Sequence, residues 1–380
     1  MVLPLLILLA LLGTINYYLA RRYFDCFGYL FPKTSFYIYL GFFVLVTLFI
    51  LLGFFRSMLP FPVGLKSVLG VINAYCMGFF VYILIFTLLA DGAFWVVRLF
   101  RVGCSKELIR FICGISAISL TLITVIYGFW NYKQLEVVEY DILLEDKTLE
   151  QDINMVVISD LHLGSVGSEN RLEEIVREIN SLNPDIICIA GDFFDSDFNS
   201  IKNPEKAIEI LNGLKSKYGA YLCLGNHDAG KTFPQMKQFI EDSGIIPLYD
   251  EKVVIDNRFV LVGRLDRSPI GNSGDMKRKD ASEVLSEIDQ SLPIIVLDHN
   301  PARAEEYGKE VDLILSGHTH KGQIFPGSLI TGMIYEVDYG YYQKDKESPQ
   351  IIVTSGVGAW GMPMKVGTNS EILKVTIKGN

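Results

Sequence analysis

All five histidines of this 380-residue chain lie in four short strings of its C-terminal part, each holding another residue type that binds metals or moves protons. The strings are Asp160-Leu161-His162, Gly225-Asn226-His227-Asp228, Asp298-His299-Asn300-Pro301 and Gly317-His318-Thr319-His320. A fifth string, Gly191-Asp192-Phe193-Phe194-Asp195, adds carboxylates. A single histidine is usually a core or loop residue with its hydrogen bonds satisfied. Five histidines, each near Asp, Asn or another His, indicate a site of chemistry.

Each string directly follows an apolar run typical of a short buried strand. These runs are Met155–Ser159, Ile186–Ala190, Tyr221–Leu224, Ile294–Leu297 and Leu313–Leu315. Amphipathic stretches between them predict helices over Glu169–Leu182, Pro204–Lys217 and Pro234–Ser243. Strands that alternate with helices predict a layered α/β domain. Because ligand sites in such sheets form at the carboxyl ends of strands, we expect the five strings to meet.

The residue types indicate which metals this edge would bind. Mixed imidazole and carboxylate ligands suit Mn, Fe or Zn better than Ca or Mg. Gly191 permits a tight turn, after which the Asp192 carboxylate is free to bridge two ions. Two ions about 3.5–4 Å apart form a clamp for in-line attack at phosphorus. The residues therefore predict a metal-dependent hydrolase of phosphoric ester or diphosphate bonds with two divalent ions, Mn being favoured and Fe or Zn the alternatives.

The ordered set D-x-H, G-D-x-x-D, G-N-H-D, H and G-H-T-H resembles that of the calcineurin-like metallophosphoesterase superfamily, over about residues 150–380. The resemblance implies a β-sheet sandwich flanked by helices, and a metal-activated hydroxide as the nucleophile. It implies that one ion is bound by Asp160, His162, Asp192 and His320, and the other by the bridging Asp192 with Asn226, His299 and His318. It makes His227 the general acid, oriented by Asp195, with Asn226 and His227 also touching the substrate.

Departures from the family pattern indicate which branch of the superfamily the chain resembles. Its Ser/Thr protein phosphatases have Arg-Gly after the second aspartate, where this chain has Ser196 and Asp197. The Gly-rich segment 355–363 resembles the bacterial membrane-associated or exported branch, which includes enzymes like the UDP-diacylglucosamine pyrophosphohydrolases; a plain sheet-edge loop is the alternative. Lys365 stands where that branch often has arginine. Lys321 is a weak candidate for contact with a substrate phosphate.

Two further segments are candidates for the rim of the site. The stretch Tyr335–Tyr342 carries four tyrosines and would form an apolar wall or a packed hairpin. Residues 266–280 form a Gly/Ser/Asp-rich insertion, a candidate mobile cap. Its cations, in or beside it, are Arg264, Arg267, Lys277 and Arg278.

Four apolar runs precede residue 131, each close to the ~20 residues that cross a bilayer as a helix. They are Val2–Ala20, Phe36–Phe55, Ser67–Ala90 and Phe111–Trp130. We therefore expect a transmembrane region with four helices over residues 1–130, a linker strand over 131–150 and the phosphoesterase domain over 151–380.

Charge divides the chain at the same place. Residues 1–130 hold nine Lys/Arg against three Asp/Glu, whereas the remaining residues hold 25 against 40. An acidic domain lacks the basic surface that nucleic-acid binding requires. The first and third connections between the runs hold most of the basic residues: Arg21, Arg22, Lys33, Arg98, Arg101, Lys106 and Arg110. The positive-inside rule then places the catalytic domain outside the cytoplasm.

The leading hypothesis is a membrane-anchored phosphoesterase or pyrophosphatase whose partners are the bilayer and a phosphorylated small molecule or lipid-linked substrate. A phosphodiesterase for a soluble nucleotide is the first alternative. A membrane sensor with a non-catalytic metal site is the second. All the ligand types are present, which favours an enzyme. The sequence carries no indication of the oligomeric state.

Overall fold

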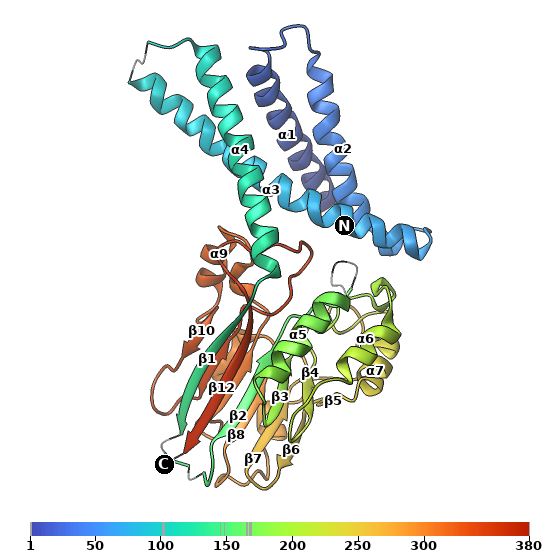
Figure 1. Ribbon diagram of the computed structural model, residues 1–380, viewed down its shortest axis with the longest axis vertical. Helices are drawn as coiled ribbons and strands as arrows, with labels where there is room; N and C mark the ends of the chain where they lie inside the picture. Colours follow the sequence, from blue (N-terminus) through green and yellow to red (C-terminus); the bar gives the residue numbers. More distant parts are fainter. Residues whose placement is uncertain are drawn as a thin grey trace. The chain divides into compact units, whose positions relative to one another are not determined.

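The computed structural model describes residues 2–100, 103–144, 146–147, 149–164, 166 and 169–379 (Figure 1). Arg101, counted among the basic residues above, lies outside them. The chain divides into two compact units, Met1–Phe129 and Trp130–Asn380. The sequence placed the division at residue 130 and a linker strand after it.

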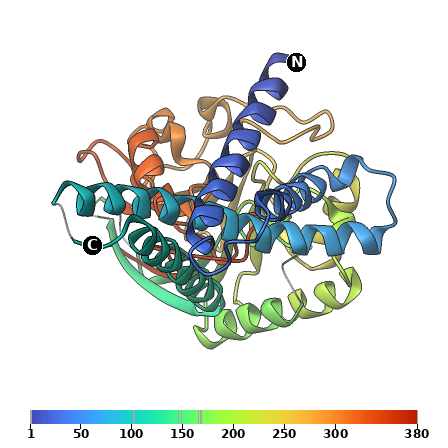
Figure 2. The same cartoon turned by 90° about the horizontal axis from the view of Figure 1, so that it is seen from above.

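The described residues of the first unit form long helices, the last of which continues into the second unit (Figure 1 and Figure 2). They are α1 (Val2–Phe27), α2 (Phe36–Phe54), α3 (Val63–Leu99) and α4 (Lys106–Lys133), with a short 3₁₀ turn at Arg56–Met58. Within the described residues, three helices are long and apolar enough to cross a membrane: Phe36–Phe54, Gly64–Leu99 and Lys106–Lys133. The expectation of four is therefore corrected to three. α1 is helical, but its last two turns carry Arg21, Arg22 and Asp25.

The second unit contains two six-stranded sheets, and the first has the order β1-β12-β2-β3-β4-β5. Its strands are β1 (Leu135–Leu144), β12 (Ser370–Gly379), β2 (Ile153–Ile158), β3 (Ile186–Ala190), β4 (Ala220–Cys223) and β5 (Ile246–Pro247). β2, β3, β4 and β5 run parallel, while β12 is antiparallel to β2 and parallel to β1. The predicted linker strand is thus β1, which pairs with the final strand along ten residues.

The second sheet has the order β10-β11-β9-β8-β7-β6. Its strands are β10 (Gly340–Tyr342), β11 (Gln350–Val353), β9 (Leu313–Ser316), β8 (Ile294–Leu297), β7 (Phe259–Gly263) and β6 (Glu251–Ile255). β6 and β7 form an antiparallel hairpin, and Asp256 and Asn257 at its turn both have φ near +54°. Two central residues with positive φ give the turn whose twist matches a hairpin.

Three apolar layers hold the second unit together. Alternate residues of both sheets, such as Met155, Ile186 and Leu261, form the layer between the sheets. The outer face of the first sheet is covered by α5 (Glu169–Ser181), α6 (Pro204–Leu211) and α7 (Phe233–Asp242). The outer face of the second is covered by the short α8 (Ala281–Val284) and a 3₁₀ segment, Pro301–Glu306. This confirms the predicted α/β sandwich flanked by helices.

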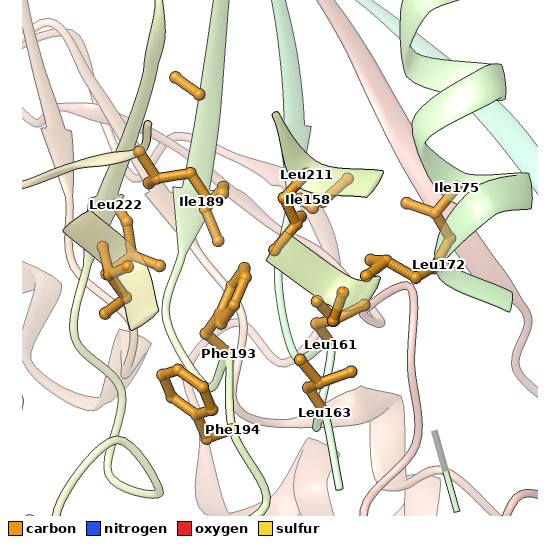
Figure 3. Close-up of a cluster of buried hydrophobic side chains, with 14 of the residues drawn as sticks. Ile158, Leu161, Leu163, Leu172, Ile175, Ile189, Phe193, Phe194, Leu211 and Leu222 are labelled. Atoms are coloured by element: carbon orange, nitrogen blue, oxygen red, sulfur yellow. The ribbon is translucent and has the colours of Figure 1, made fainter. Parts of the chain in front are cut away.

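Two phenylalanines in the layer under α5–α7 fix the loop that follows β3. Phe193 and Phe194 are fully buried, their ring centres 5.1 Å apart, among the aliphatic residues of β2, β3 and α5 (Figure 3). Full burial of each stabilises the fold by roughly 1.5–3 kcal/mol. Since they stand between Asp192 and Asp195, their packing positions both carboxylates.

Two parts of the domain differ from the expectation. α6 ends at Leu211, earlier than predicted. α9 (Gly327–Ile334), which follows the last histidine string, was not predicted, because its eight residues, with Ser328 and Thr331 as the polar side chains, are too few to establish an amphipathic period.

Candidate metal centre

The five strings meet where β2, β3 and β4 of one sheet and β8 and β9 of the other come to their carboxyl ends. β2 to β4 are mutually parallel, as are β8 and β9. Each loop therefore leaves its sheet at the same edge, and candidate ligand atoms from both sheets lie within 4.8 Å of one another in each group. This is the meeting that the sequence predicted.

The first cluster joins Asp160 and His162, after β2, to His320, after β9. The Nε2 atoms of His162 and His320 are 3.1 Å apart. His320 Nε2 also lies 3.2 Å from Asp160 Oδ1. All three residues are buried. Two ring nitrogens and a carboxylate that converge in this way are the ligand types of Zn, Mn and Fe sites.

The second cluster joins Asp192, after β3, to His299, after β8, and His318, after β9. His299 Nε2 lies 3.1 Å from Asp192 Oδ2, and His318 Nδ1 lies 3.3 Å from His299 Nε2. Asp192 Oδ2 is also 3.8 Å from Nε2 of His162 in the first cluster. The Asp192 carboxylate therefore lies between the two clusters, as a bridging ligand must.

The buried atoms without partners fit two bound cations. Asn226 Oδ1 is buried and accepts no hydrogen bond from any described residue. Buried polar atoms nearly always have a partner, so this amide oxygen, on the residue before the His227 N–H that donates to Asp192, fits a metal ligand. The residues present thus fit a two-metal centre.

The backbone is bent sharply at most of the expected ligands. Five of them have φ between +47° and +71°: Asp160, His162, Asp192, His318 and His320. Non-glycine residues rarely adopt this left-handed region, and each such residue costs about 1–3 kcal/mol. Backbone hydrogen bonds from Asp160 to Gly191 (3.0 Å) and from His162 to Asp192 (3.1 Å) hold the bends in place.

Burial and charge set the protonation of the imidazoles. Burial lowers the pKa of His162 to about 3 and that of His318 to about 4, so both rings are neutral near pH 7 and have a lone pair for a cation. The pKa of His299 shifts in the opposite direction. Burial disfavours its charged form, but the Asp192 carboxylate outweighs burial and raises the pKa of His299 well above the usual value. A cation bound between these two residues takes the place of that proton.

His227 lies beside the clusters rather than in either ligand pair. Its ring centre is 5.0 Å from that of His162, edge to face, and its backbone N–H donates to Asp192 Oδ1 at 2.8 Å. Its Nδ1 is 2.5 Å from Ser196 Oγ. Asp195, His162 and His227 also form a close group, with Asp195 Oδ1 4.0 Å from His162 Nδ1. The orienting role of Asp195 stays a prediction, and Ser196 is a further contact that the sequence analysis did not assign.

Ser196→Ala is expected to lower kcat by about tenfold, because loss of a residue that orients an active group typically costs 10–100-fold. The imidazole of His227 would lose the hydroxyl that contacts its Nδ1. Steady-state rates with a diester substrate measure the effect. Ser200→Ala is the matched control, since its hydroxyl donates instead to the Asp197 carbonyl. Equal rates for the two variants would show that Ser196 does not contribute to turnover.

Two other buried aspartates in the strings accept hydrogen bonds that hold the loops of the site together. The Asp228 carboxylate accepts backbone N–H groups of Phe193 (3.2 Å), Phe194 (2.8 Å) and Gly225 (2.8 Å), joining the loops after β3 and β4. Asp298 accepts two bonds from Arg278, at 3.0 and 2.6 Å, directly before His299. The sequence signal for both was an acidic residue adjoining a histidine, but their partners are distant in the chain.

The cations considered for substrate contact have different surroundings. Lys365 is fully buried, and its Nζ donates to the carbonyls of Ser355 (2.8 Å), Gly356 (2.6 Å) and Asn369 (2.8 Å). It therefore holds the Gly-rich segment instead of facing a substrate. Lys321 Nζ lies 3.8 Å from the ring centre of Tyr339, and its contact with a phosphate stays a prediction.

The Gly-rich segment packs on a metal ligand. A Cβ at Gly356, where φ is +78°, would come within 2.7 Å of Asp160 Cβ. A Cβ at Gly358 would come within 2.4 Å of the Asp160 carbonyl. These positions require glycine because the segment lies directly against Asp160.

The insertion 266–280 is attached to the loop after β4. Ile270 N–H donates to the Asn226 carbonyl at 2.7 Å, and Gly230 N–H donates to the Asn272 carbonyl at 2.8 Å. Among its cations, Arg264 pairs with Asp250 and Arg278 with Asp298. The predicted cap is thus near the site, with these two arginines engaged in internal ion pairs.

The model of the calcineurin-like phosphoesterase family matches residues 153–322, from β2 to the last histidine string. An uncharacterized metallophosphoesterase from Aquifex aeolicus is 34% identical over 261 residues, which cover 68% of this chain and 98% of that protein. The chain belongs to the calcineurin-like phosphoesterases. Membership implies a metal-dependent hydrolase of phosphoesters, in agreement with the two clusters.

Other members of the family align with a similar share of the chain. An uncharacterized metallophosphoesterase from Campylobacter jejuni is 29% identical, covering 72% of this chain and 71% of that protein. A transmembrane protein with metallophosphoesterase domain from Danio rerio is 30% identical, covering 69% and 62%. The family domain thus occurs in relatives from bacteria and from an animal.

Proposed function

We propose that the protein is a membrane-anchored phosphoesterase with two divalent metal ions that hydrolyses a phosphate ester or diphosphate bond of a lipid-linked substrate. The observation that carries the proposal is the Asp192 carboxylate, which lies between two buried histidine–aspartate clusters with His227 beside them. When bound, two divalent ions supply an activated water and neutralise charge on the phosphoryl oxygens; the donor set favours Mn, with Fe or Zn as alternatives.

The candidate ligands divide between the two ions. In the first cluster Asp160, His162 and His320 would hold one ion, and in the second His299, His318 and the Asn226 amide would hold the other. Asp192 would belong to both. A phosphoryl group bound by these two ions would lie at the edge of the sandwich, and its leaving oxygen would take a proton from a residue outside the two ligand sets.

His227 is the residue suited to donate that proton. In the imidazolium form, His227 would donate its Nδ1 proton to Ser196 Oγ, which leaves the Nε2 proton for the leaving oxygen. Its backbone bond to Asp192 keeps the ring beside the metal ligands. Proton donation by a positioned group typically contributes 10²–10⁴-fold to the rate.

A substrate screen on purified full-length protein tests the proposal. We expect hydrolysis of lipid diphosphates or long-chain phosphodiesters, restored by Mn²⁺ after chelation. Monoesters, nucleotide diphosphates and soluble diesters complete the panel. Faster turnover of a soluble nucleotide diester than of any lipid would favour the nucleotide phosphodiesterase. Metal binding without hydrolysis of any of them would favour a sensor.

The side of the membrane follows from chain order. The domain follows α4 and therefore shares a side with the connection between α2 and α3, whether or not α1 spans. The connections before α2 and after α3 share the other side and hold most of the basic residues. The positive-inside rule then puts the domain outside the cytoplasm.

Labelling of an introduced cysteine measures this orientation. Lys346 is exposed in the domain, and Lys346→Cys is expected to react with an impermeant maleimide in intact cells. The native Cys104, exposed in the connection after α3, is the internal control and should react only after lysis. The reverse pattern at the two sites would place the domain in the cytoplasm and reassign the compartment of its substrate.

A further inference from the structure

α9 is an apolar helix that buries none of its eight residues. Its sequence, GSLITGMI, contains no charge. Leu329 and Ile330 are more than half exposed, Met333 is 79% exposed and Ile334 is 68% exposed. A helix at the surface of a globular domain normally turns its apolar residues inward, and a contiguous exposed apolar patch marks a surface that binds something.

The patch extends onto two neighbouring segments. Phe325 precedes α9 and Trp360 belongs to the Gly-rich segment, and both side chains are exposed. Gln323 joins the segments: its Nε2 donates to the Trp360 carbonyl at 2.9 Å and its Oε1 accepts the Trp360 N–H at 2.8 Å. We call this set the apolar platform: Phe325, Leu329, Ile330, Met333, Ile334 and Trp360.

The apolar platform borders the metal centre. The Trp360 ring centre is 6.2 Å from that of His227. Tyr335, directly after α9, has its ring centre 6.1 Å from that of His318. Asp338 accepts hydrogen bonds from Thr331 in α9 (2.7 Å) and from Thr319 (2.6 Å), which stands between two expected metal ligands. A molecule bound to the platform at Trp360 would therefore be separated from His227 by the Trp360 side chain alone.

The platform also adjoins the point where the chain enters the domain. Asn131, in the last turn of α4, donates to the carbonyls of Lys365 (3.2 Å) and Thr368 (2.8 Å). Val366, between them, accepts the Phe325 N–H at 2.8 Å and forms a bridge with Ile324. One short segment thus contacts both the end of α4 and the start of the platform. Since α4 is long and apolar enough to cross a bilayer, this segment lies beside the last turn of a candidate membrane span.

We propose that the apolar platform docks on the lipid bilayer and takes amphiphilic phosphate or diphosphate substrates whose acyl chains remain in that bilayer. The substrate class rests on the proposed function, whereas the docking does not. α9 carries no charge that would pair with a protein partner, and Trp360 and Tyr335 beside it are the amphipathic aromatic residues that membrane interfaces favour. The anchored chain keeps the platform at high effective concentration beside lipid.

Photocrosslinking on the full-length protein in phosphatidylcholine–phosphatidylglycerol vesicles tests the docking. A benzophenone amino acid is introduced at Met333 and, as the matched control, at Val254, an apolar residue of β6 that is 52% exposed. We expect a phospholipid adduct at Met333 and none at Val254. Adducts of Met333 with a second copy or with another segment of the chain, or equal lipid labelling at both positions, would overturn the proposal.

A double variant tests the substrate class. Leu329→Asp with Met333→Asp is expected to lower kcat/KM for a vesicle-borne long-chain phosphodiester by about tenfold or more, because charged residues leave an apolar lipid boundary. The rate with soluble bis(p-nitrophenyl) phosphate should not change. Equal losses on both substrates would contradict the substrate class. Absence of hydrolysis of either substrate by the unaltered protein would refute the proposed function while leaving the crosslinking result interpretable.

Discussion

Asp192→Asn is expected to abolish turnover and to remove at least one of the two metal ions, the largest effect of any single substitution in the site. The amide has nearly the same shape but no charge, and Asp192 is the carboxylate that faces both clusters, 3.1 Å from His299 and 3.8 Å from His162. Two cations held close together need that negative charge. Elemental analysis of the purified variant, with rates measured on the same sample, gives both quantities.

The control for this substitution is at the other end of the same strand. Asp185 precedes β3, and its carboxylate accepts the Asn154 N–H at 2.9 Å. Asp185→Asn keeps an oxygen that accepts this bond, so metal content and rate should stay near those of the unaltered protein. Two ions and a normal rate in Asp192→Asn would refute the dinuclear site.

His227→Ala is expected to lower kcat by about 10²–10⁴-fold while both ions stay bound, the usual cost of losing a general acid. The His227 ring lies beside His162 and Trp360 and contacts Ser196. Among the described residues, it belongs neither to the ligand group that contains Asp160 nor to the one that contains Asp192. The deficit should be smaller for nitrophenolate leaving groups, since these need little protonation. Rates over a series of leaving groups measure the difference.

Asp195→Asn and the metal content of His227→Ala separate the remaining explanations. Asp195→Asn should give a milder form of the same leaving-group pattern, if it orients the imidazole. Loss of an ion in His227→Ala would show that His227 is a metal ligand. His162, Asp195 and His227 lie close enough together to hold an ion, so the metal content of this variant distinguishes the two roles. An equal slowing of good and poor leaving groups would make it a substrate-positioning residue instead.

Local patterns in the sequence determined the elements and which residues would converge. The apolar runs before Asp160, Asp192 and His299 form buried strands, and their carboxyl ends do meet at one edge. The prediction works because short apolar strands that alternate with helices have few ways to pack, and all of them gather the strand ends. The four long apolar runs likewise form helices, although three of them satisfy the criteria for a membrane span.

Only the tertiary structure decided which groups touch. The contacts of Ser196 with His227, of Asp228 with the loop after β3, and of Lys365 with three carbonyls join segments that are separate in the chain or bend back on themselves. Lys365, which the sequence marked only as standing where the related branch often has arginine, is a fully buried donor to the carbonyls of Ser355, Gly356 and Asn369. Residue type alone does not specify such burial.

The apolar platform shows the same division. The sequence of α9 is short and mostly apolar, so it is too short to show a period that distinguishes a buried strand from an exposed helix. The sequence by itself determined the ligand types, their order along the chain and the apolar anchor, because these depend on local composition and spacing. The exposure of α9, its place between the last turn of α4 and the metal centre, and the partners of His227 required the folded chain, because they depend on contacts between residues far apart in sequence.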